Sequence, residues 1–154
     1  MDKLIDGLKK FQTLIYPLHK TRFEELAESQ APRVLFITCS DSRVDPNAGN
    51  IVPPHSHETG GMTASIEYAI SVLDIKNIII CGHSNCGAMK AAMNTNELKE
   101  LPHVKTWLDH CRAAVKSVEN HHHCDNHEHL DEEYLDEVTK KNIILQMHHI
   151  KTHP

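Results

Sequence analysis

Two short segments of this sequence contain residue types that bind metals and move protons. Residues 39–43 read CSDSR, and residues 83–86 read HSNC. Together they offer two thiols, an imidazole and a carboxylate, a set of donors that zinc accepts in tetrahedral geometry. Thiolate and imidazole donors favour zinc over magnesium or calcium. The two segments therefore predict a zinc site formed by Cys39, His83 and Cys86.

The fourth position on the metal decides what such a site does. Asp41 closes the site when it binds the metal. Arg43 offers Asp41 a cationic partner, and a salt bridge between them would open the fourth position to water. Zinc lowers the pKa of bound water to about 7, which provides hydroxide at neutral pH. The sequence thus predicts Asp41 as a zinc ligand only in a closed state, and it leaves open which state prevails.

The elements that must position these residues are two short apolar strands. Residues 33–38 (RVLFIT) and 77–81 (NIIIC) are the β-branched runs that predict buried strands. Apolar residues at helical spacing predict helices over 3–16, ended by Pro17, and over 21–29, 62–73, 86 onward, 102–118 and 131–150. The alternation favours an α/β fold with three layers, in which helices flank a small, mostly parallel central sheet. Carboxyl ends of parallel strands share one edge, where we expect both segments to meet.

Length and composition limit the other possibilities. The 154 residues predict a single domain over 1–154, with N-terminal helices over about 2–29 and a zinc-binding core over about 33–150. A net charge of −5 gives no support for nucleic-acid binding. No run approaches the roughly 20 apolar residues of a membrane span. The charged N-terminus does not read as a signal peptide, so we expect a cytoplasmic protein without membrane partners.

The two segments and their surroundings resemble the β-class carbonic anhydrases. The motifs CSDSR and GHSNCGA carry the resemblance, which covers nearly the whole chain and includes PRVLFITCSDSRVDP, GGMTASIEYAI and NIILQM. The resemblance implies one zinc ion per chain on Cys39, His83 and Cys86. It also implies a catalytic dyad of Asp41 and Arg43. Two substrate contacts are implied as well, from Gln30 and from the backbone N–H of Gly87.

The activity that the resemblance implies is that of a carbonate dehydratase, a lyase. Such an enzyme hydrates CO2 reversibly to bicarbonate and a proton through hydroxide bound to zinc. The resemblance further implies a homodimer or a higher homo-oligomer, in which the amphipathic N-terminal helices pack on a partner subunit. The pathway that uses the bicarbonate stays open.

The chain also departs from the family pattern. Relatives have a strand between the SRVDP and NAGN segments, whereas Pro46 here runs directly into Asn47. Relatives also continue into a further strand and helix beyond the position of Pro154. An alternative therefore stands beside the enzyme: a non-catalytic or weakly active zinc-binding relative whose pocket is disrupted by the missing strand. A thiol-redox enzyme is disfavoured because Cys81 and Cys86 do not form a C-x-x-C pair.

Other histidine-rich and cysteine positions carry weaker signals. The segment over 121–129 holds five histidines and one cysteine, and we interpret it as a solvated loop while leaving metal binding open. His55 and His57 are interpreted as part of a polar loop. Cys111 lies at helical spacing with Trp107 and Leu108, which predicts a core position.

Overall fold

A computed structural model describes residues 2–40, 48–56, 60–120 and 132–154. Asp41, Arg43, His57 and the histidine-rich segment 121–129 therefore lie outside the described residues. The chain divides into two compact units, Met1–Pro32 and Arg33–Pro154, and each is described by itself. The single domain over 1–154 stays a prediction.

The first unit is helical throughout its length. It consists of α1 (Asp2–Lys10), a π-helical turn η1 (Phe11–Ile15) and α2 (Tyr16–Glu28). The predicted helix end at Pro17 is wrong, because Pro17 lies in the first turn of α2. A proline is tolerated there, since backbone N–H groups of the first turn have no partner within the helix. None of the described residues of this unit is buried.

The second unit is built on the two predicted strands. β1 (Val34–Thr38) and β2 (Asn77–Cys81) pair in parallel, in a register that joins Val34 to Asn77 and Thr38 to Cys81. Both strands and their direction are as predicted. Because the last residues of the two strands are partners, Cys39 and Gly82 leave the sheet side by side. Within the described ranges the sheet has two strands.

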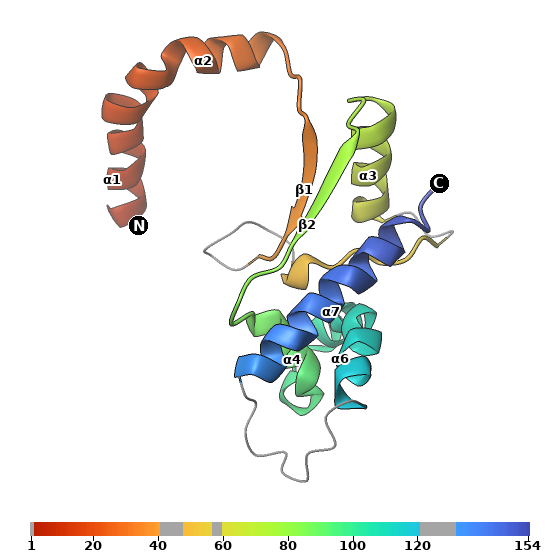
Figure 1. The fold of residues 1–154 in the computed structure, drawn as a ribbon. Helices are drawn as coiled ribbons and strands as arrows, with labels where there is room; N and C mark the ends of the chain where they lie inside the picture. The colour runs from red at the N-terminus through yellow and green to blue at the C-terminus, as the bar shows by residue number, and fades with distance from the viewer. Residues whose placement is uncertain (1, 41–47, 57–59, 121–131) are drawn as a thin grey trace. The chain divides into compact units, whose positions relative to one another are not determined.

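Helices flank this small sheet (Figure 1). The 3-10 turn η2 (Ala48–Asn50) and α3 (Gly61–Ser71) lie between the strands in sequence. After β2 come α4 (Gly87–Met93), η3 (Thr95–Leu98), α5 (Pro102–Leu108), η4 (Asp109–Cys111), α6 (Arg112–Glu119) and α7 (Glu132–Ile150). The helix predicted over 102–118 is therefore interrupted by a 3-10 turn. α7 packs against both α4 and α6.

The core of the second unit has two parts. One part lies against the sheet and contains Ile37, Val52 and Ile66. The other lies beyond the carboxyl ends of the strands, where α4, α6 and α7 meet, and its members include Cys39, Cys86 and Cys111. The predicted core position of Cys111 is confirmed. The predicted metal-binding thiols of Cys39 and Cys86 thus belong to the packed interior and not to a surface loop.

Candidate metal centre

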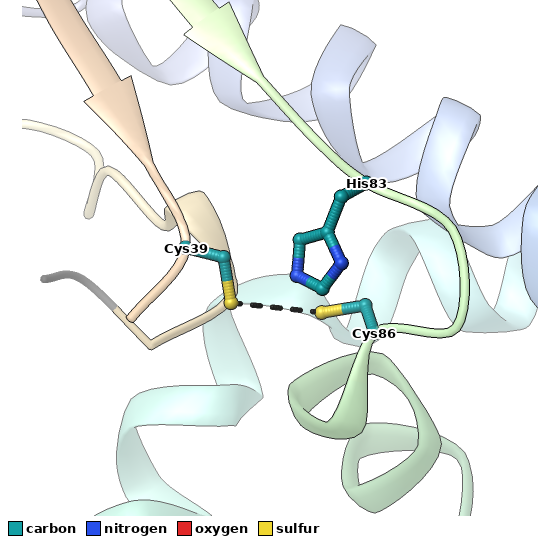
Figure 2. Close-up of side chains that lie close together, drawn as sticks. All are labelled: Cys39, His83 and Cys86. Carbon is teal, nitrogen blue, oxygen red and sulfur yellow. Dashed lines mark hydrogen bonds between the residues drawn. The ribbon is translucent and has the colours of Figure 1, made fainter. Parts of the chain in front are cut away.

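The structure brings Cys39, His83 and Cys86 together at the carboxyl ends of the strands. Cys39 directly follows β1, whereas His83 and Cys86 belong to the turn between β2 and α4. Their ligand atoms all lie within 4.8 Å of one another, and Figure 2 shows the three side chains pointing toward a common centre. In the described part of the chain they form the one such group of three metal-binding side chains. The predicted convergence is confirmed.

The distance between the two sulfur atoms tests whether zinc fits. Two Zn–S bonds of about 2.3 Å at a tetrahedral angle place the sulfur atoms about 3.8 Å apart. The Sγ atoms of Cys39 and Cys86 lie 3.7 Å apart. A disulfide would need about 2.05 Å, and both residues are free thiols. The site therefore has the donors and the spacing of a Cys-His-Cys zinc centre.

His83 is oriented by the backbone of the turn that carries it. Its Nδ1 lies 2.9 Å from the carbonyl oxygen of Ser84 and donates a hydrogen bond to it when Nδ1 bears the proton. That tautomer leaves the lone pair of Nε2 available to a metal. Metal-binding histidines commonly have this arrangement, in which the second ring nitrogen donates to a carbonyl group and fixes the ring.

Burial makes the thiol of Cys86 a poor acid in the absence of a cation. Cys39 and Cys86 are only 3% and 1% exposed. Burial raises the pKa of Cys86, and the neighbouring Cys39 raises it further. Backbone N–H groups of Met89 and Ala88 act in the opposite direction at the start of α4 but do not outweigh burial. The net effect of the protein is therefore to favour the protonated thiol of Cys86, and the positive charge of a bound metal would act in the opposite direction.

One hydrogen bond to a metal ligand could not be predicted from the sequence. The backbone N–H of Gly49, in η2, donates to the sulfur of Cys39 over 3.3 Å. Gly49 has a left-handed backbone (φ 73°), and a Cβ there would approach Met89 Cε to 2.9 Å. A glycine is therefore needed for this close approach. The signal in the sequence was the glycine itself.

The remaining predicted site residues are less fully defined. Asp41 and Arg43 lie outside the described residues. Gln30 belongs to the first unit, so no relation to the metal centre follows for it. Gly87 is the first residue of α4, directly after Cys86. Apart from its chain neighbours and its own helix backbone, no described residue has a heavy atom within 4 Å of the place a Cβ would take.

Comparison with known proteins agrees with this geometry. The family model described as carbonic anhydrase matches residues 46–154. A carbonic anhydrase of Pseudomonas aeruginosa is 41% identical over the whole of this chain and 74% of its own length. The chain belongs to the β-carbonic anhydrase family. The solved β-carbonic anhydrase CcaA superposes with a TM-score of 0.89 at 40% identity, covering all of this chain and 74% of that one.

The resemblance to the β-class and the α/β fold are thereby confirmed. A carbonic anhydrase of Synechococcus elongatus is 43% identical to this chain, which spans 61% of that relative's length. A Coccomyxa β-carbonic anhydrase solved with acetazolamide gives a TM-score of 0.74 at 26% identity, covering 99% of this chain and 72% of its own. No helix among the described segments is long and apolar enough to cross a membrane.

Proposed function

We propose that this chain is a zinc-dependent carbonic anhydrase that interconverts CO2 and bicarbonate. The observation that carries the proposal is the sulfur–sulfur distance of 3.7 Å beside the His83 ring, in a chain of this family. Zinc, when bound, would supply Lewis-acid activation of a water molecule near neutral pH. Cys39, His83 and Cys86 would occupy three positions and leave the fourth to solvent or to Asp41.

Four further residues complete the proposed site. Asp41, ionised and held by Arg43, would accept a hydrogen bond from the attacking oxygen and orient it toward CO2. Gln30 and the backbone N–H of Gly87 would donate to the substrate oxygens, where negative charge develops. The position of Gly87 directly after the ligand Cys86, at the start of α4, supports this role.

We also propose that the protein acts as a homodimer or a larger homo-oligomer. Apolar side chains of the first unit are exposed, including Leu8 at 56% and Leu14 at 62%. A helical unit whose described residues are all exposed has little to stabilise its helices, because most helix stability comes from packing an apolar face. A solved pair of tetrameric β-carbonic anhydrases from Sordaria macrospora, 28% identical at a TM-score of 0.65, supports an assembly. A reducing cytoplasm would keep the two ligand thiols free of oxidation.

The experiment that tests the function is stopped-flow hydration of CO2 by protein whose zinc content has been measured. We expect one zinc per chain and hydration well above the buffer rate. Asp41→Asn should lower turnover and spare most of the zinc. Full zinc with hydration at the buffer rate would contradict the enzyme and support the alternative, a zinc-binding relative without catalysis.

A further inference from the structure

The turn η2, next to the metal centre, is held by side chains that are distant from it in sequence. Trp107 of α5 donates from Nε1 to the carbonyl oxygen of Ala48 over 3.0 Å. Asn142 of α7 donates from Nδ2 to the carbonyl oxygen of Gly49 over 3.1 Å. These two carbonyl groups belong to the peptide units on either side of Gly49, so both of its peptide planes are fixed from outside the turn.

The peptide that Trp107 holds is the one that contacts the metal ligand. A trans peptide is planar, and its C=O and N–H point in opposite directions. Holding the carbonyl oxygen of Ala48 therefore directs the N–H of Gly49 away from Trp107. That N–H donates to the sulfur of Cys39 over 3.3 Å. The orientation of one indole thus sets the direction of a hydrogen bond to a metal ligand.

Asn142 is itself held in place by a second buried amide. Gln146, one turn further along α7, donates from Nε2 to the Oδ1 of Asn142 over 2.7 Å. The Oε1 of Gln146 accepts a hydrogen bond from the backbone N–H of Val52 over 2.9 Å. Both amide side chains are 0% exposed. Burying two amides costs free energy unless their hydrogen bonds are made, so this pair holds the segment in one orientation.

We propose that Trp107 and Asn142 are positioning residues for the metal centre, because together they aim the Gly49 N–H at the sulfur of Cys39. The inference rests on the proposed function, since it concerns the strength with which that sulfur binds zinc. A hydrogen bond to a ligand sulfur stabilises its negative charge and fixes its direction. Partners of this kind, once removed, typically weaken metal binding by about 10-fold to 100-fold.

The test uses Trp107→Phe and Asn142→Leu in the full chain, each of which removes one donor and keeps a side chain of related shape. Zinc affinity is measured by competition with a chromophoric chelator, and the cobalt-substituted proteins are examined for their sulfur-to-cobalt charge-transfer band. We expect weaker zinc binding in each variant, by at most the loss of about 10-fold to 100-fold that direct removal of such a hydrogen bond causes. We also expect the charge-transfer band to move to lower energy, since a sulfur without its hydrogen bond gives up electrons more easily.

A control variant separates positioning from simple loss of stability. Thr139→Val also removes a buried hydrogen bond of α7, but its partner is the carbonyl oxygen of Leu135 in the same helix. It should lower the melting temperature of the metal-free protein and leave the zinc affinity and cobalt band unchanged. Trp107→Phe and Asn142→Leu behaving like Thr139→Val would overturn the inference while leaving the proposed function intact. Absence of cobalt or zinc binding in the unaltered protein would overturn both.

Discussion

The two units of this chain differ in how their apolar side chains are used. In the second unit, the metal-binding edge is surrounded by buried residues from α4, α6 and α7, and Met89 and Val138 are fully buried. In the first unit, Leu8 and its neighbours remain exposed along a helical run of 27 residues. Contacts among the described residues of the second unit account for the position of the metal ligands, whereas the described residues of the first unit bury none of their apolar side chains.

This difference assigns a separate role to each unit. The geometry of the metal centre depends on contacts between residues far apart in sequence, such as that of Trp107 with Ala48. The first unit has local contacts, among them the stacked rings of Tyr16 and Phe23 with centroids 5.6 Å apart. Changes in the second unit should therefore affect the metal and stability, and changes to the exposed apolar side chains of α1 and α2 should affect association between subunits.

The largest expected effect follows from removing a ligand in the second unit. Cys86→Ser should weaken zinc binding by about 100-fold or more, because the roughly 10–16 kcal/mol of a typical zinc site is shared among four donors. Chelator competition measures the affinity. Cys81→Ser is the matched control, since Cys81 ends β2 but lies outside the ligand group. Equal zinc affinity in the two variants would contradict the assignment of Cys86 as a zinc ligand.

A charge on the apolar face of α1 should break the assembly and leave zinc in place. Leu8→Asp removes an apolar side chain whose burial contributes about 1.5–3 kcal/mol, so subunit association should weaken about 10-fold to 100-fold. Light scattering coupled to size-exclusion chromatography measures the mass as a function of concentration. Gln12→Asp introduces the same charge at a polar position of the next turn and should leave the mass unchanged. A mass that Leu8→Asp leaves unchanged would argue against this surface as an interface.

The same substitution should have opposite effects on stability in the two units. A Cβ at Gly82 would approach Ile143 Cδ1 to 2.8 Å and Thr139 Cγ2 to 3.0 Å. A Cβ at Gly7 would have no described neighbour within 4 Å outside its own helix. Gly82→Ala should therefore lower the free energy of unfolding by about 1–3 kcal/mol through overpacking. Gly7→Ala should raise helix stability by about 0.5–1 kcal/mol, as alanine does inside a helix. Urea unfolding measures the stability of both variants. A loss of unfolding free energy in Gly7→Ala as large as in Gly82→Ala would contradict the expected difference between the two units.

The last effect concerns pH and Cys111, a buried thiol outside the ligand group. Burial, with a smaller contribution from Cys86, raises the pKa of Cys111 from 9.0 to about 12. The unfolded chain loses this proton at lower pH than the folded chain, so stability falls as the pH rises from 9 toward 12. The expected loss approaches about 1.4 kcal/mol per pH unit within that window. Urea unfolding of the metal-free protein should show a loss of about 1 kcal/mol between pH 9 and 10 from this thiol, and Cys111→Ala should remove that part of the slope. Equal slopes in the two proteins would contradict the raised pKa of Cys111.

The parts of the fold that the sequence predicted are those with a local physical cause. The runs 33–38 and 77–81 are short, apolar and β-branched, and Cys39 and His83 follow them directly, so the strands, their parallel direction and the ligand group could all be predicted. The helix across Pro17 could not, because a π-helical turn before it places the proline in a tolerated position. Asp41 and Arg43 stay predictions.

The contacts around the metal centre could not be predicted from the sequence for a different reason. The bonds of Asn142 to Gly49 and of Gln146 to Val52 join residues more than 90 positions apart. No local pattern encodes such pairs. The one signal was two amides four residues apart on α7, among the buried Val138 and Leu135. Polar residues on an otherwise apolar helix face indicate a buried partner without naming it.

X-ray absorption at the zinc edge of the full chain tests the central claim most directly. The account predicts two sulfur neighbours at about 2.3 Å and two lighter neighbours at about 2.0–2.2 Å. Cys81→Ser should leave this pattern unchanged, and Cys39→Ser should reduce the sulfur count. Zinc surrounded by nitrogen and oxygen alone, or no bound zinc at all, would contradict the assignment of Cys39, His83 and Cys86 as its ligands.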